Sequence, residues 1–367
     1  VGLSWYFLER FYSGRGIRSC TDTVISVSLR QTPELRAHFQ LETSEDINTL
    51  SDLDLSLLCG ELDLGASGRH AQLAALRAPI VSTADVQRYI LSPMCVQGRR
   101  AIVDTLRGQQ VTENVWNTEI PAVAPATTFV SHCWQAPFDE LLSALDEHMC
   151  STPLDRKLSQ YFWLDVFCVN PYAAATVSGE DWSKTFEKMI HSIGHTLLVA
   201  VPALAPLAVT RSWCIYETFC ALQAPGCQFS VVTSHGEAAT LEDVSSYEIA
   251  ISTLAAIDSE RAVATYEADK RRIDNAIVAA GGHARLDDAV RGGLLAELLQ
   301  RAASRGAEHF GVVRQLCDAG ASLESEVGLY RATALMTASN PRCGLVERRR
   351  LRDAGRLEEI REQDAQV

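Results

Sequence analysis

Short apolar runs alternate with helix-length amphipathic stretches through the middle of the chain. The apolar runs are rich in β-branched and aromatic residues, which indicates strands. The predicted strands are 127–134 (TTFVSHCW), 161–169 (YFWLDVFCV), 196–201 (TLLVAV) and 228–233 (QFSVVT). Apolar positions at helical spacing predict the helices between them, at 138–149, 181–194 and 212–223. This alternation, with solidly apolar strands, predicts an α/β fold: a parallel sheet flanked by helices.

The segments on either side of this region give weaker patterns. Residues 1–120 predict a helical or mixed region to which no function can be assigned, and the prolines of EIPAVAPA (119–126) predict a linker. The amphipathic stretch 254–282 predicts a long helix closed by Gly281 and Gly282. The predicted domains are an N-terminal region at 1–120, the α/β domain at 127–253, a helical extension at 254–300 and an all-helical region at 301–367.

The last predicted region contains two similar segments. VVRQLCDAG (312–320) returns as ERRRLRDAG (347–355), 35 residues later, with ATALMTAS (332–339) between them. The length and the T-A-L-x-x-A core resemble ankyrin repeats, whose period is about 33 residues. The match covers one and a half units, so a partial ankyrin-like region is expected at 301–367. Two unrelated helices that both end in DAG remain the alternative.

Charge and composition narrow the class of partner. The formal net charge is −13, which disfavours a nucleic-acid binder and an anionic membrane surface. The longest apolar run, 196–209, is shorter than the roughly 20 residues of a membrane span and contains Pro202 and Pro206. The eleven cysteines show no zinc-binding spacing. We therefore expect free thiols, no metal site, no cleavable signal peptide and a cytoplasmic location.

Polar residues follow the apolar strands where ligands bind in parallel sheets, at the carboxyl ends. These candidate residues come after the first strand, within and after the second, and after the third; they are His132, Trp134, Asp165, Asn170, Arg211, Trp213 and Glu217. We expect them to converge on one edge of the sheet. All seven are candidate residues of a ligand site.

Two carboxylates have alternative roles. With Ser212 as N-cap, Glu217 lies in the second helical turn on one stripe with Trp213 and Cys220, and partial desolvation there would raise its pKa. From spacing alone, pairing of Glu217 with Arg211 or exposure to solvent is favoured. Asp165 lies within an apolar run and needs a partner, either His132 or Arg211. A structural role for Asp165 is favoured over a catalytic one.

Other combinations of reactive residues are excluded. His132 and Cys133 are adjacent on a predicted strand, so their side chains point to opposite faces and cannot form a dyad. His191 and His195 stand four residues apart, but the metalloprotease pattern H-E-x-x-H requires glutamate where Ser192 stands.

Three segments in order resemble a known family. TFVSHCW, YFWLDVFCVN and TRSWCIYE resemble successive elements of TIR (Toll/interleukin-1 receptor) domains, and are most similar to a divergent group found in protists and algae. Ser212, Trp213, Cys214 and Glu217 all match the family's W-C-x-x-E element. Thr128, His132 and Pro171 depart from the family pattern, and no fifth strand is evident after 233.

The resemblance implies a flavodoxin-like sheet and a role in signalling. Enzymatic TIR domains cleave the nicotinamide glycosidic bond of NAD, so Glu217 would act as the catalytic carboxylate, with NAD as substrate, no cofactor, and Trp134 or Trp213 stacking on a ring of the dinucleotide. Other TIR domains are non-catalytic, which would make the chain a scaffold that self-associates through this domain and binds proteins through the ankyrin-like repeats. A domain that binds a nucleotide without cleaving it is a third alternative.

Overall fold

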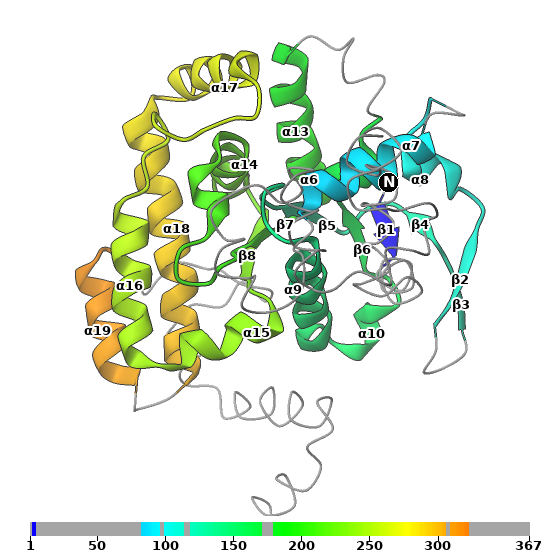
Figure 1. Ribbon diagram of the computed structural model, residues 1–367. Helices are drawn as coiled ribbons and strands as arrows, with labels where there is room; N and C mark the ends of the chain where they lie inside the picture. Colours follow the sequence, from blue (N-terminus) through cyan, green and yellow to red (C-terminus); the bar gives the residue numbers. More distant parts are fainter. Residues whose placement is uncertain are drawn as a thin grey trace, which may run out of the picture. The chain divides into compact units, whose positions relative to one another are not determined.

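The computed structural model describes residues 2–4, 82–95, 99–113, 118–170, 179–305 and 309–322 (Figure 1). The chain divides into two compact units that are interleaved along the sequence. The first unit contains Val1–Thr127, His132–Leu142 and Gln160–Val177. The second contains Thr128–Ser131, Ser143–Ser159 and Ser178–Val367. Each unit is described by itself.

A parallel sheet forms the centre of the second unit. Its strands are β5 (Thr128–Ser131), β7 (His195–Val199) and β8 (Gln228–Val232). Strand β7 pairs in parallel with β5 on one side and with β8 on the other. Every residue of β5 and β7 is buried, as expected for a parallel sheet that is covered on both faces. The predicted α/β fold with a parallel sheet flanked by helices is confirmed.

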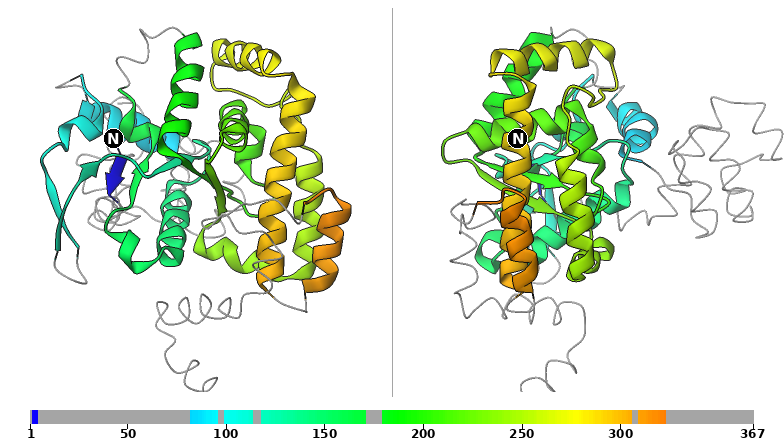
Figure 2. Two further views of the ribbon diagram at one scale, coloured as in Figure 1. Left: turned by 180° about the vertical axis from the view of Figure 1, so that it is seen from behind. Right: turned by 90° about the vertical axis from the view of Figure 1, so that its left-hand side faces the viewer.

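Helices pack on these strands and on one another. Strands β5 and β7 contact α13 and α14, and β8 contacts α14 and α18. Figure 2 shows α18 beside α16 and α19, in agreement with their contacts. The long helices are α9 (Phe138–Ser151), α13 (Gly179–Ile193), α14 (Ser212–Gln223), α16 (Val244–Ala255), α17 (Glu267–Ala279), α18 (His283–Ser304) and α19 (Phe310–Asp318). Shorter turns of helix are α10 (Leu154–Lys157), η3 (Leu207–Thr210), α15 (His235–Ala238) and η4 (Ala239–Glu242).

The three helices predicted between the strands are confirmed as α9, α13 and α14. The predicted end of the second is also confirmed, because Gly194 follows α13 with φ of +74°, a left-handed conformation that glycine adopts without strain. The apolar side of α9 is buried at Phe138, Leu141, Leu142 and Leu145, which are the positions that predicted the helix.

The first unit contains antiparallel strands and short helical segments. Strand β1 pairs antiparallel with β4 on one side and β6 on the other, and β2 pairs antiparallel with β3. The strands are β1 (Gly2–Ser4), β2 (Gln110–Glu113), β3 (Thr118–Pro121), β4 (Val123–Ala124) and β6 (Tyr161–Trp163). The helical segments are α6 (Thr83–Val86), η2 (Gln87–Leu91), α7 (Ser92–Cys95), α8 (Ile102–Thr105) and α11 (Asp165–Cys168).

Two predictions fail in this unit. The second predicted strand, 161–169, is a strand only as far as Trp163, and Asp165 begins α11. Its carboxylate accepts the Val166 N–H at 2.7 Å, so it satisfies an N–H group that a helix start leaves unpaired. The predicted linker at 119–126 is also wrong, because β3 and β4 occupy most of it. Pro121 is tolerated as the last residue of β3, where a missing donor costs little.

The long helix predicted at 254–282 is wrong as well. Helix α16 ends at Ala255, and α17 begins only at Glu267. The carboxylate of Asp258 accepts the backbone N–H groups of Glu260 and Arg261, both at 3.1 Å, and this turn is a local alternative to helical hydrogen bonds.

Two other predictions concern the ends of the chain. Helix α19 followed by Gly320, at φ of +104°, accounts for the segment 312–320. The rest of the predicted ankyrin-like region from residue 323 lies outside the described residues, and so does most of the helical or mixed region predicted at 1–120. In the described part of that region, Ser82 caps α6 through a reciprocal pair of hydrogen bonds with Asp85. Among the described residues, no helix has the length and apolar character needed to cross a membrane.

A histidine on β7 lies inside the core of the second unit. Both ring nitrogens of His195 have hydroxyl partners at 3.1 Å, Thr128 Oγ1 at Nδ1 and Ser230 Oγ at Nε2. Its ring lies 5.7 Å from that of the buried His148. Burial lowers the pKa of His195 from 6.5 to about 4, so its imidazole is neutral at physiological pH.

The stability of the chain should therefore fall in mild acid. Between pH 6.5 and about 4 the unfolded chain binds a proton at residue 195 that the folded chain excludes, so the free energy of unfolding decreases as pH falls. The full loss from this residue is about 3 kcal/mol. Urea denaturation at about pH 7 and about pH 5 measures about 2 kcal/mol of it, because the full loss is reached only near pH 4. His195→Gln should flatten the dependence, and an unchanged slope in that variant would show that other groups cause it.

Candidate functional site

The candidate catalytic carboxylate is held at the end of the first parallel strand. The hydroxyl of Ser131, the last residue of β5, donates to Glu217 Oε2 at 2.6 Å. Ser131 is fully buried, and Glu217 is only 8% exposed. The alternative in which Glu217 faces solvent is therefore wrong. The guanidinium of Arg211 donates to Thr265 Oγ1 at 2.9 Å, and Ser131 is one partner of Glu217.

Glu217 lies in the second turn of α14, as predicted. The start of that helix, however, is held by a different contact from the one predicted. Arg211 is the N-cap residue, and Ser212 is already inside the helix. The Ser212 hydroxyl donates to Ala262 O, and its N–H donates to Val263 O, both at 3.0 Å. The prediction of Ser212 as N-cap is wrong because this side chain bonds to a distant loop. The first turn of α14 is thereby fixed to the segment between α16 and α17.

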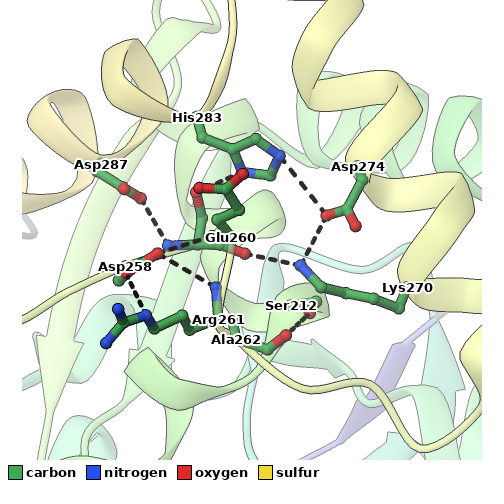
Figure 3. A network of polar contacts seen from close by, with 10 residues as sticks. Ser212, Asp258, Glu260, Arg261, Ala262, Lys270, Asp274, His283 and Asp287 are labelled. Carbon is green, nitrogen blue, oxygen red and sulfur yellow. Dashed lines mark hydrogen bonds and ion pairs between the residues drawn. The ribbon is translucent and has the colours of Figure 1, made fainter.

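A polar network secures that segment (Figure 3). Lys270 Nζ donates to Ser259 O at 2.8 Å and to Asp274 Oδ1 at 2.7 Å. The Ser259 N–H donates to Asp287 Oδ1 at 3.0 Å. Because Lys270 and Asp274 belong to α17 and Asp287 to α18, both helices hold the segment that supports the start of α14.

In the same network a serine lies next to a histidine, which in turn lies near a carboxylate. Ser259 Oγ lies 2.8 Å from His283 Nδ1, and His283 Nε2 lies 3.8 Å from Asp274 Oδ1. A nucleophilic serine must reach its substrate, but Ser259 is 1% exposed, and Asp274 is already paired with Lys270. We infer that these side chains hold the segment between α16 and α17 in place.

Aromatic rings pack along one side of the site. Trp213 meets the buried Phe186 edge to face, with ring centroids 5.1 Å apart. Phe186 also stacks on Trp182 at 5.6 Å and meets Phe129 of β5 edge to face at 6.3 Å. These contacts fix the orientation of Trp213 from α13 and β5. The stacking of Trp213 on a substrate ring stays a prediction.

Two titratable residues flank Glu217 on α14. Burial raises the pKa of the Cys220 thiol to about 12, and burial also raises the pKa of the Tyr216 hydroxyl above its ordinary value. The negative charge of Glu217 also raises the pKa of the Cys220 thiol, by less than burial does. Because the thiolate is the nucleophilic form of cysteine, Cys220 is not a candidate nucleophile.

The remaining predicted site residues belong to the first unit. Trp134 Nε1 donates to Asp165 Oδ2 at 2.8 Å, and His132 Nε2 lies 3.7 Å from Asp165 Oδ1. Of the two partners considered for Asp165, His132 is therefore adjacent, although Trp134 makes the hydrogen bond. His132 and Cys133 follow the end of β5, so the prediction that both lie on a strand, on opposite faces, is wrong.

Asn170 has a structural partner. Its Nδ2 donates to the backbone carbonyl of Arg99 at 2.7 Å. Arg99 has φ of +46°, which is unusual for a residue with a side chain, and this hydrogen bond supports that conformation. The seven candidate residues thus fall into two groups, His132, Trp134, Asp165 and Asn170 in the first unit and Arg211, Trp213 and Glu217 in the second. Their convergence on one edge stays a prediction.

A small cavity of about 50 Å³ lies where β7 and β8 end. Its wall is mainly apolar, with Glu297 and Arg301 of α18 among the residues that line it. Glu217 is not one of the lining residues. The position agrees with the rule that ligands bind at carboxyl ends of parallel strands, but the volume is far below the roughly 300 Å³ of a typical small-molecule site.

Sequence reasoning missed one residue of the site. Ser131 stands within an apolar run, and the signal for its polar partner is a hydroxyl at the last position of a buried strand.

Comparisons with protein-family models, with curated proteins and with solved structures give no match for this chain. The likeness to TIR domains and ankyrin repeats therefore rests on the sequence segments alone.

Proposed function

We propose that the chain is a TIR-like signalling protein whose α/β region hydrolyses the nicotinamide glycosidic bond of NAD, with Glu217 as the catalytic carboxylate. The observation that carries the proposal is the position of Glu217: it follows Trp213 by four residues on the helix after β7, and its carboxylate is held by the last residue of β5. A buried acidic side chain at the carboxyl end of a parallel strand is suited to act on a ligand bound there.

The chemistry requires a negative charge near the ribose. As the bond between ribose C1′ and the nicotinamide nitrogen breaks, positive charge develops on the ribose, nicotinamide leaves with the bonding electrons, and water adds to give ADP-ribose. A carboxylate in a water-poor site stabilises that charge more strongly than one in solvent. The hydrogen bond from Ser131 holds the carboxylate in one orientation, so little reorganisation accompanies the reaction.

The burial of Glu217 also predicts how the activity depends on concentration. Because Glu217 is 8% exposed, substrate reaches it only after neighbouring side chains move. We expect self-association to favour the open arrangement, so that nicotinamide release rises more steeply than in proportion to protein concentration. The test is chromatographic measurement of nicotinamide and ADP-ribose over a range of concentrations of the full chain. No release at any concentration, in conditions where an active TIR enzyme releases nicotinamide, would contradict the proposal.

A non-catalytic scaffold is the second candidate, and a specific observation favours it. The Glu217 carboxylate is tied to Ser131 and does not line the cavity at the ends of β7 and β8, as expected of a structural carboxylate. In this case the TIR-like region self-associates, and the ankyrin-like region binds other proteins. Sedimentation would then show self-association that survives Glu217→Gln, and neither protein would release nicotinamide.

A further inference from the structure

Three side chains with metal-binding atoms meet on the second unit, away from Glu217. One ligand atom from each of Asp146, Cys150 and His235 lies within 4.8 Å of the other two. Asp146 and Cys150 are four residues apart on α9, so they project from the same side of that helix. His235 is the first residue of α15, which follows β8.

The histidine is oriented by a fourth side chain. His235 Nδ1 lies 2.7 Å from Oε2 of Glu147, whose side chain is 9% exposed. The other ring nitrogen, Nε2, lies 2.8 Å from Asp146 Oδ2. The His235 N–H also donates to Ser143 Oγ at 3.1 Å, which ties the backbone to α9. A buried carboxylate on one ring nitrogen, with the other directed at further ligands, is the usual arrangement around a metal-bound histidine.

The geometry points to a zinc site formed by His235 Nε2, Cys150 Sγ and a carboxylate oxygen of Asp146, with Glu147 orienting the histidine. Nitrogen, sulfur and oxygen donors together suit Zn²⁺, whereas Ca²⁺ and Mg²⁺ take oxygen ligands. Zinc bond lengths place tetrahedral ligand atoms about 3.3–3.6 Å apart. The His235 Nε2–Asp146 Oδ2 separation is 2.8 Å, and all three ligand atoms lie within 4.8 Å of one another, so small rotations of side chains bring them to this range. The side chains of His235 and Asp146 are each 45% exposed and have room to rotate.

Zinc in this position would replace the proton between His235 Nε2 and Asp146 Oδ2. Binding displaces the Nε2 proton and the Cys150 thiol proton to solvent, because zinc ligands coordinate in their deprotonated forms. The three protein ligands leave a fourth position for water or another donor. The ion would join α15 to α9 and so fix the chain immediately after β8. The sequence did not predict this site, because His235 stands far along the chain from Asp146 and Cys150 and no short motif contains all three.

Binding of Co²⁺ and Zn²⁺ to the full, reduced chain tests the proposal. Titration with Co²⁺ should produce d–d absorption bands typical of tetrahedral cobalt and a thiolate-to-cobalt charge-transfer band, at one ion per chain, and Zn²⁺ should abolish both. Cys150→Ser should remove the charge-transfer band. Cys317→Ser is the matched control, because Cys317 is a half-buried cysteine on α19, and this variant should keep the band.

Affinities for Zn²⁺ measured by competition with a chelating dye complete the test. His235→Gln and Asp146→Asn should each weaken binding by at least about 10-fold, and Glu147→Gln should weaken it by roughly 10-fold through the orientation of His235. His191→Gln, at an exposed histidine on α13, should leave the affinity unchanged. The proposal is overturned if the folded wild-type chain binds no Co²⁺, or if the charge-transfer band persists in Cys150→Ser. The absence of a cobalt spectrum from the wild-type chain overturns the proposal even where a variant fails to fold.

Discussion

Replacing Phe186 with alanine is expected to lower the free energy of unfolding by about 3–5 kcal/mol. Phe186 is 9% exposed and contacts the rings of Phe129, Trp182 and Trp213, so its removal leaves a cavity between α13, β5 and α14. The cost includes the lost transfer free energy of the side chain and the cavity that its neighbours cannot fill. Urea denaturation near neutral pH measures the change.

A smaller substitution at the same position is the control. Phe186→Leu keeps most of the apolar volume and should cost less than half as much as Phe186→Ala. The chain has six tryptophans, so fluorescence does not report on Trp213 alone. The contact between Phe186 and Trp213 is therefore tested by measuring the free energy of unfolding of each Phe186 variant with and without Trp213→Phe. Phe186→Ala and Trp213→Phe should be non-additive because the two rings are in contact. Strict additivity, or a loss below about 1 kcal/mol for Phe186→Ala, would show that this cluster does not stabilise the site.

Replacing Glu217 with glutamine is expected to reduce nicotinamide release by at least about 100-fold. The amide has nearly the shape of the carboxylate, and its oxygen can still accept the hydrogen bond from Ser131. It carries no negative charge, so it cannot stabilise the positive charge that develops on the ribose. Folding should be preserved, with a melting temperature close to that of the wild-type chain.

Two further variants separate charge from structure. Ser131→Ala keeps the charge of Glu217 but removes its hydrogen-bond donor, so a smaller loss of rate is expected than for Glu217→Gln. Glu248→Gln is the matched control, since Glu248 is an exposed glutamate on α16, and its rate should equal that of the wild-type chain. A structural role for Glu217 predicts instead that Ser131→Ala and Glu217→Gln change stability and leave nicotinamide release equal to that of the wild-type chain.

The α/β part of the fold could be predicted because local pattern and burial agree there. Strands β5, β7 and β8 are rich in apolar residues and largely buried, and the helices between them carry apolar residues at regular spacing. Helix α14 was predicted at its observed bounds, Ser212–Gln223.

The errors occurred where one polar side chain changes the backbone. Asp165 ends an apparently continuous strand because its carboxylate bonds the next N–H and starts α11. Asp258 interrupts a helical pattern in the same way, by accepting the N–H groups of Glu260 and Arg261. Residues 119–126 form strands despite their prolines because those prolines stand at or beyond strand ends. Hydrophobic periodicity indicates which residues are buried, and it does not indicate such local hydrogen bonds.

The site was predicted less fully than the fold because its contacts join distant parts of the chain. Glu217 and its helix could be identified from sequence, but its bond to Ser131 spans 86 residues. The hydrogen bond from the Ser212 hydroxyl to Ala262 O spans 50 residues. Because of it, Ser212 does not cap α14 as expected. Neither pairing follows from spacing, since many hydroxyls and carboxylates in the sequence could have been paired.

Nicotinamide release by the concentrated full chain, compared with Glu217→Gln at the same concentration, is the most direct test of whether Glu217 is catalytic. The expected result is release of nicotinamide and ADP-ribose in equal amounts by the wild-type chain, with a rate at least about 100-fold lower for the folded variant. Equal rates for the two proteins would contradict a catalytic role for Glu217, and no release from either would contradict NAD hydrolysis itself.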